Sequence, residues 1–249
     1  MKNPWVLAAA VWLLLTVPVC AAPSGFDGVW QNNDHSDYGM KRADNLPLSP
    51  AWRKKSDELD KIRADGGTLP ADDSQCIPSG MPSLMESGPF AILTTPHYIQ
   101  IFGGRGLQVR NIRLDRTRHT EDRFLFDSFS GESIAHWEGK TLVVDTIAVR
   151  SDAELVYALK VGKPHIVERM TLLAPDTLQI DTIVTDPVAL IKPWRYQMTF
   201  TRDTKGGLID SIYCIAAYDR DVDPTTGKQG FDLTPPPEEG VGVPQSIVH

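Results

Sequence analysis

From residue 90 onward, apolar and polar residues alternate in short runs separated by turn residues, which is the pattern of β-strands. The run 133–147 is the richest in β-branched residues. It predicts two strands joined by a tight turn at Gly139, a residue type that adopts positive φ freely. With a first strand at 26–31, the predicted strands are 90–94, 97–102, 107–114, 133–138, 141–149, 165–173, 177–185, 194–202 and 210–218.

These strands, about ten in number and mostly joined by short turns, predict a mainly β protein. We expect one antiparallel, lipocalin-like β-barrel domain spanning 22–220. Gly28 and Trp30 form a Gly-x-Trp motif that is typical of the first strand in lipocalin-type barrels. A two-sheet sandwich is the alternative. One short helix is expected outside the sheet at about 50–65, beginning after Ser49 and ending before Gly66.

Period-two alternation places two acidic side chains in apolar rows. Glu168 shares a strand face with Ile166 and Met170, and Asp145 shares one with Val143. Burying an unpaired carboxylate is costly, so each acid must be paired, protonated or functional. For Glu168, the alternative to a functional role is a structural ion pair with a neighbouring arginine.

Residues 1–21 have the features of a secretory signal peptide: Lys2, an apolar stretch at 6–17, and small residues before an expected cleavage near Ala21 or Ala22. We therefore expect a periplasmic or secreted bacterial protein that is not inserted in a membrane after cleavage. A lipid anchor on Cys20 is the alternative. Residues 221–249, rich in Pro, Gly and acidic residues, predict an extended tail.

The charge of the chain limits its partners. Loss of Lys2 with the signal peptide would take the formal net charge from −7 to −8, which argues against nucleic acid or an anionic membrane as a partner. An arginine-rich stretch from Arg105 to Arg123 has two interpretations. It is a solvated strand and loop balanced by nearby acids, or a clamp for a carboxylate or phosphate.

Two cysteines, Cys76 and Cys214, would remain after cleavage. In an oxidising compartment this even number predicts a disulfide between them, and two separately buried thiols are the alternative. The histidines show no zinc-type spacing, so we expect no metal site. Asp34, His35 and Asp37 are interpreted as solvated loop residues rather than metal ligands.

Several short motifs stand out between residues 76 and 214: Cys76-x-Pro-x-Gly-x-Pro82, His136-Trp-Glu-Gly-x-Thr-Leu-Val-Val-Asp-Thr146, Glu168-Arg169, Asp176-Thr-Leu178, Asp186-Pro187, Lys192-Pro-Trp194 and Cys214. Together they resemble a family of exported, mostly uncharacterised bacterial proteins. The resemblance implies a secreted, lipocalin-like, β-rich domain and assigns no activity. Two stretches depart from the family pattern: 114–119 lacks its glycine and proline, and 215–217 lacks its acidic residue.

The sequence contains no signature of nucleophilic, phosphate-binding or dinucleotide-binding chemistry. The hypothesis that remains is cofactor-independent acid–base catalysis, of an isomerase, lyase or hydratase type, on a small apolar molecule. His136 would be the base, Glu168 the acid or its orienter, and Arg110 the clamp on a developing oxyanion. Further candidate catalytic residues are Asp145 and, in a loop that could cover a barrel mouth, Asp115 and His119.

The alternative function is a lipocalin-like binder or carrier of a hydrophobic ligand, without turnover. A third hypothesis is an envelope interaction module whose aromatic residues are simply core. The candidate ligand-binding residues, besides Arg110, are Trp30, Trp137, Tyr157, Trp194 and Tyr196. Fold alone does not decide among these functions.

Overall fold

The computed structural model describes residues 25–32, 46–67, 78–86, 89–103, 108–156 and 158–205. Several predictions concern residues outside these ranges, and they stay predictions. They are the signal peptide, the lipid anchor on Cys20, the loop at 34–37, the Cys76–Cys214 disulfide, Tyr157, the strand at 210–218 and the tail at 221–249.

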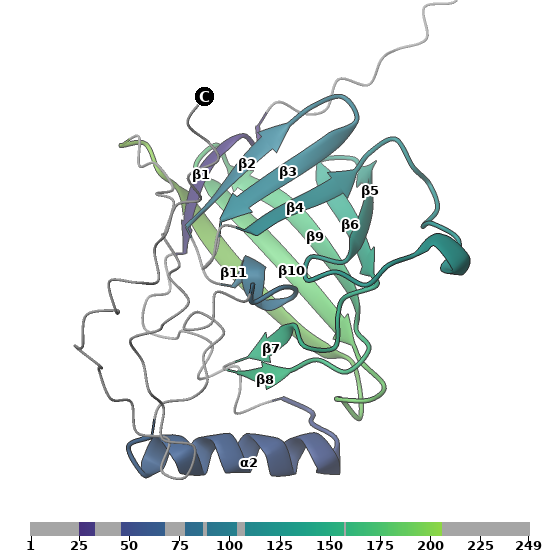
Figure 1. The fold of residues 1–249 in the computed structure, drawn as a ribbon. Coiled ribbons are helices and arrows are strands. Elements are labelled where there is room, and N and C mark those ends of the chain that lie inside the picture. Colours follow the sequence, from purple (N-terminus) through teal and green to yellow (C-terminus); the bar gives the residue numbers. More distant parts are fainter. Residues whose placement is uncertain are drawn as a thin grey trace, which may run out of the picture.

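Nine strands of the described residues form one closed barrel, which confirms the mainly β, barrel architecture (Figure 1). Their order around the barrel is β1, β11, β10, β9, β6, β5, β4, β3 and β2, and β2 pairs with β1. Their bounds are β1 Gly28–Asn32, β2 Phe90–Thr94, β3 Tyr98–Gly103, β4 Gln108–Arg113, β5 Glu132–Glu138, β6 Thr141–Ile147, β9 His165–Ala174, β10 Thr177–Thr185 and β11 Trp194–Arg202.

The chain departs from a simple antiparallel meander at β4 and β5. These neighbours run parallel, with Ile112 opposite Ser133. Parallel neighbours require a crossover connection, and residues 114–131 provide it. This connection includes the 3-10 helix η3 (Asp122–Phe124). A second excursion, between β6 and β9, forms a two-stranded ribbon of β7 (Glu154–Val156) and β8 (Leu159–Lys160).

The predicted hairpin in the run 133–147 is present as β5 and β6. Gly139 adopts φ 61° in the turn, and Glu138 pairs with Thr141 on either side of it. No heavy atom other than those of the adjacent residues lies within 4 Å of a Cβ built at Gly139, so its conformation rather than crowding favours glycine there.

Alternation along β9 places a carboxylate inside the barrel, as expected. Ile166, Glu168 and Met170 are each fully buried. They lie within a hydrophobic core of large apolar side chains, which strands all around the barrel contribute to its interior. Its fully buried members include Trp30, Phe90, Ile92, Ile99, Ile101, Ile112, Leu142 and Phe200.

The predicted inward placement of Asp145 is wrong. The inward row of β6 consists of Leu142, Val144 and Thr146, each fully buried, while the side chain of Asp145 is 42% exposed on the outer wall. Both faces of β6 are apolar around Val143, so alternation within the strand is compatible with either row facing inward. The neighbouring strands decide the parity.

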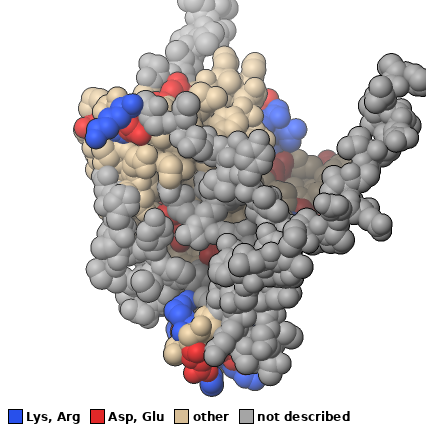
Figure 2. Space-filling model, turned by 60° about the vertical axis from the view of Figure 1, so that its left-hand side comes forward, with Lys and Arg blue, Asp and Glu red and all other residues tan. Residues whose placement is uncertain are grey.

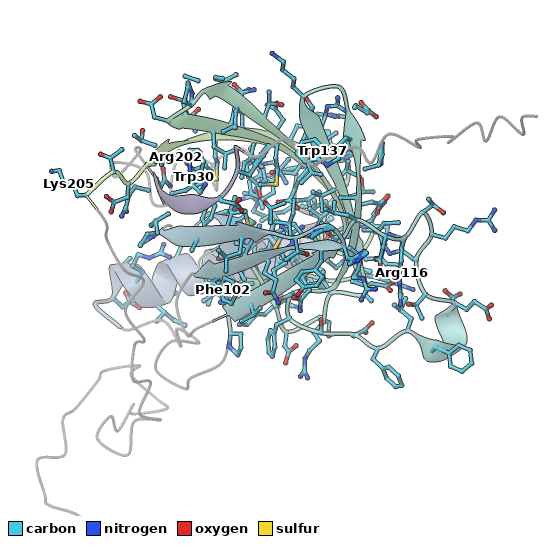
Figure 3. The ribbon with its side chains drawn as sticks, turned by 90° about the horizontal axis from the view of Figure 1, so that it is seen from above. Trp30, Phe102, Arg116, Trp137, Arg202 and Lys205 are labelled. Atoms are coloured by element: carbon cyan, nitrogen blue, oxygen red, sulfur yellow. The ribbon has the colours of Figure 1, made fainter. Side chains whose placement is uncertain are left out.

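The Gly-x-Trp motif closes one end of the barrel. Trp30 is fully buried, and its indole nitrogen donates a 2.8 Å hydrogen bond to the carbonyl of Phe26. The guanidinium of Arg202, on the last strand, lies 4.2 Å from the centre of the Trp30 ring and donates to the carbonyls of Gly25, Asp27 and Pro175 (Figure 3). Arg202 thus ties the segment before β1 to β11.

Helix α2 (Pro50–Ala64), at the predicted position, lies beyond the opposite end of the barrel, next to the β7–β8 ribbon (Figure 1). Trp52 anchors it by a 2.8 Å hydrogen bond from its indole nitrogen to the carbonyl of Lys160. None of its residues is buried, and charged side chains gather over it (Figure 2). Ser49 precedes it, but its hydroxyl donates to the carbonyl of Val188 instead of capping the helix.

Buried residues of the 3-10 helix η2 (Ser83–Met85) and of the ribbon continue the barrel core toward this end. The carboxylate of Asp186 organises the same region by accepting hydrogen bonds from the amides of Gly162, Lys163, Val188 and Ala189. In the described residues, no helix is long and apolar enough to cross a membrane.

Candidate functional site

Four side chains form a continuous hydrogen-bonded chain on the outer wall of the barrel. His119 Nδ1 lies 3.2 Å from Glu132 Oε2, and His119 Nε2 lies 3.2 Å from Asp145 Oδ1. His165 Nε2 lies 2.8 Å from the same Asp145 oxygen. We call Glu132, His119, Asp145 and His165 the outer-wall cluster.

Strand register brings three of these residues together. Asp145 is paired with Ile134 of β5 and with Val167 of β9, so Glu132 and His165 are its diagonal neighbours on the same face. Diagonal neighbours are within reach of long side chains. The fourth member, His119, comes from the 114–131 connection.

The proton positions follow from the chemistry of the partners. Ionised carboxylates only accept hydrogen bonds, so a neutral His119 can donate to Glu132 or to Asp145 but not to both. An imidazolium donates to both at once. His165 donates its Nε2 proton to Asp145, which leaves the Nδ1 lone pair of a neutral imidazole available as a base.

Glu132 holds the connection against the wall. It accepts hydrogen bonds from the amide of Thr120 (3.0 Å) and from the guanidinium of Arg116 (3.3 Å), which Figure 3 shows at the side of the barrel. Partial burial acts to raise the pKa of the Glu132 carboxyl, but the hydrogen bonds from Thr120 and His119 outweigh it and hold this pKa below the ordinary value.

This lowered pKa predicts an acid-sensitive contribution to stability. Since the folded-state pKa lies below the unfolded value, the contribution is complete above about pH 4.5 and is lost as the pH falls through the folded pKa. Glu132→Gln should therefore cost about 1 kcal/mol of unfolding free energy at neutral pH. The deficit should shrink below pH 4.5 in urea unfolding curves. Glu58→Gln, on the exposed face of α2, is the control, and a deficit independent of pH would contradict the assignment.

His136 does not meet Glu168. Its side chain is 66% exposed on the outer wall, where Nε2 lies 3.2 Å from Glu138. Ala135, the preceding residue, faces inward at the level of Glu168, so the wall itself separates the two side chains. The expectation that His136 and Glu168 share one cavity is therefore wrong.

Glu168 and Arg110 form an ion pair inside the barrel, with both side chains fully buried. Arg110 Nη1 lies 3.1 Å from Glu168 Oε1, and Nη2 bonds both Glu168 Oε2 and the hydroxyl of Thr146. Arg110 Nε donates to Ser133. The geometry matches the structural alternative for Glu168. All three guanidinium nitrogens of Arg110 have buried partners, which leaves its predicted oxyanion-binding role without support.

Asp115, in the same connection as His119, has contacts separate from those of the outer-wall cluster. Its carboxylate accepts a bidentate pair of hydrogen bonds from Arg113, at 2.9 and 2.8 Å, and this pairing lowers the pKa of the Asp115 carboxyl. Asp115 and His119, predicted to act together, thus have different partners. Of the predicted catalytic residues, the structure joins only His119 and Asp145 to each other directly.

The candidate aromatic residues form two separate pairs of contacts. Trp137 packs against Phe26, with ring centroids 5.4 Å apart, and the carbonyl of the same Phe26 accepts the indole hydrogen bond of Trp30. Trp194 and Tyr196 contact each other with centroids 4.3 Å apart. Trp30 is fully buried and Trp194 is 5% exposed, so these two residues belong to the hydrophobic core.

Sequence reasoning missed Glu132 and His165 as site residues. His165 was visible only as the first residue of a strand, and Glu132 as the residue before one. Their meeting depends on β6 pairing with both β5 and β9, which is not a local property of the sequence. Within the described ranges, no group of three or more His, Cys, Asp and Glu residues is arranged to hold a metal ion.

Comparison with known proteins adds no relative to this picture. No protein-family model matches the chain, and a search of curated proteins finds no significant match.

Proposed function

We propose that the protein is an exported, cofactor-independent acid–base enzyme whose reactive group is His165 in the outer-wall cluster. The observation that carries the proposal is the 2.8 Å contact between His165 Nε2 and Asp145 Oδ1. The same oxygen lies 3.2 Å from His119 Nε2. A histidine oriented by a carboxylate is a common general base. The reaction class we favour is isomerisation, elimination or hydration.

His165 is the catalytic residue in this proposal. Its side chain is 49% exposed, so a substrate can reach Nδ1 while Nε2 stays bonded to Asp145. Asp145 positions the ring and stabilises the imidazolium that forms when Nδ1 takes a proton. His119, 18% exposed and held by Glu132, positions Asp145 from the other side.

The surroundings favour a small, largely apolar substrate. Ile134 and Val167 lie directly opposite Asp145 on the two neighbouring strands, and Ile147 follows two residues later on the same face. All three side chains are partly exposed. Apolar neighbours lower the local polarity, which strengthens the attraction between the Asp145 carboxylate and the imidazolium that forms at His165.

The outer wall is preferred to the barrel interior because of what fills the interior. Fully buried apolar side chains and the Arg110–Glu168 pair lie in the barrel interior, where a lipocalin-like carrier would hold its ligand. The carrier hypothesis therefore draws no support from the described core, whereas the cluster supports catalysis.

The test is base-catalysed ring opening of 5-nitrobenzisoxazole, an apolar aromatic probe. A base removes the proton on the ring carbon, its electron pair forms the nitrile, and the nitrogen–oxygen bond breaks to release a coloured phenolate. We expect saturable acceleration by the wild-type protein. His165→Gln should lower the rate about a hundredfold or more, because it removes the base.

His136→Gln is the matched control, because His136 also pairs with a carboxylate on the outer wall. It should leave the rate unchanged. A wild-type rate no greater than that of free imidazole at the same concentration, or an equal rate for His165→Gln, would reject the proposal. Nitrogen-15 NMR provides a second readout, since neutral His165 should carry its proton on Nε2.

A further inference from the structure

The connection between β4 and β5 projects a short segment away from the barrel and anchors it on both sides (Figure 1). On one side, Thr120 and Arg116 are bonded to Glu132. On the other, the amide of Ser128 donates to the carbonyl of Ala148, and Ser128 forms a bridge with Val149. The segment between these anchors, residues 121–127, we call the tip.

The tip exposes large apolar side chains. Phe126 is 84% exposed and Phe124 is 58% exposed, with Leu125 between them partly exposed. Phe126 is the most exposed of the large hydrophobic residues in the described chain. The 3-10 turn of η3 keeps the tip compact, since the amides of Phe124 and Leu125 bond the carbonyls of Glu121 and Asp122. The exposure thus belongs to a short, anchored projection.

We propose that the tip docks on the headgroup region of a zwitterionic phospholipid bilayer, with Phe124 and Phe126 entering the upper acyl layer. A projecting tip fits a deformable surface without a complementary groove, and aromatic residues partition well to membrane interfaces. The tip carries Glu121, Asp122 and Asp127 against one arginine, Arg123. Acidic flanks complement the ammonium groups of phosphatidylcholine or phosphatidylethanolamine and disfavour anionic lipid.

This docking is distinct from the proposed catalysis, although both use the same connection. Shallow insertion requires no membrane-crossing segment. His119 lies two residues before the tip, so docking would bring the outer-wall cluster toward the lipid surface. A substrate dissolved in lipid would then reach the wall without crossing bulk water.

The test is flotation of the full chain, purified from the soluble fraction, with phosphatidylcholine vesicles. We expect wild-type protein to float with the vesicles, and the bound fraction to persist in 0.5 M NaCl because apolar insertion drives it. Replacing both phenylalanines, Phe124→Ser with Phe126→Ser, should weaken partitioning by about tenfold for each residue removed. Vesicles rich in phosphatidylglycerol should bind no more wild-type protein than phosphatidylcholine vesicles do.

Leu173→Ser with Ile191→Ser is the matched control, since these residues are 58% and 69% exposed elsewhere on the molecule. It should float like the wild type. Phe126→Trp should still bind the vesicles. Brominated phosphatidylcholine should quench its tryptophan fluorescence more than it quenches the fluorescence of the wild-type protein. Failure of the wild type to float, or equal flotation of the double phenylalanine variant, would overturn the proposal. Binding only to phosphatidylglycerol vesicles would overturn it too.

Discussion

Replacing Arg110 with methionine is expected to lower the free energy of unfolding by about 3–5 kcal/mol, because it leaves a buried carboxylate without its counter-charge. Arg110 and Glu168 are both fully buried, and their pairing joins β4 to β9 across the interior. The same guanidinium donates to Ser133 and Thr146. A single substitution would therefore remove partners from three strands besides β4. Urea unfolding followed by circular dichroism measures the effect.

Two variants make this result specific. Arg113→Met removes a half-exposed arginine whose partner is Asp115, and it should cost far less than Arg110→Met because solvent screens an exposed ion pair. Arg110→Met combined with Glu168→Leu removes both charges and should recover most of the loss, since an apolar pair can replace a buried ion pair. If Arg110→Met were as stable as Arg113→Met, the prediction that the buried Arg110–Glu168 pair is important for stability would be wrong.

Trp30→Ala should have an effect of similar size, about 3–5 kcal/mol, because it opens a cavity at the closed end of the barrel. The indole is fully buried, bonds the carbonyl of Phe26 and carries the guanidinium of Arg202 over its ring. Its loss would also leave Arg202 without the surface on which it stacks. Denaturant midpoints and thermal unfolding both report this loss.

Trp52→Ala is the comparison for this second result. Trp52 also makes an indole hydrogen bond, to the carbonyl of Lys160, but it lies on the outer helix and is only partly buried. Its replacement should cost about 1–2 kcal/mol. Equal losses for the two tryptophans would mean that the closed end contributes no more than the attachment of α2.

Much of the architecture was predictable because it depends on local patterns. The alternation along β9 and β11, the turn at Gly139 and the helix beginning at Pro50 all involve residues close in sequence. The barrel was expected from the number of strands and the shortness of their turns. Even the burial of Glu168 followed from the residues beside it in its own strand.

The candidate site was less predictable because it depends on pairing between distant strands. His119 and Asp145 were each recognisable as chemically capable residues, but the pattern assigned Asp145 to the interior and gave His119 the wrong partner. His136, within the most distinctive motif, lies on the outer wall away from both. A shift of one residue moves a side chain through the wall, and only neighbouring strands determine that parity.

By itself, the sequence determined the class of fold and the rows of side chains along each strand, because strand geometry repeats every two residues. Tertiary structure alone decided which row of β6 faces inward, that Arg110 meets Glu168, and that His165 and His119 share an oxygen of Asp145. These contacts form between segments 20 to 58 residues apart, whose register is decided by closure of the whole barrel.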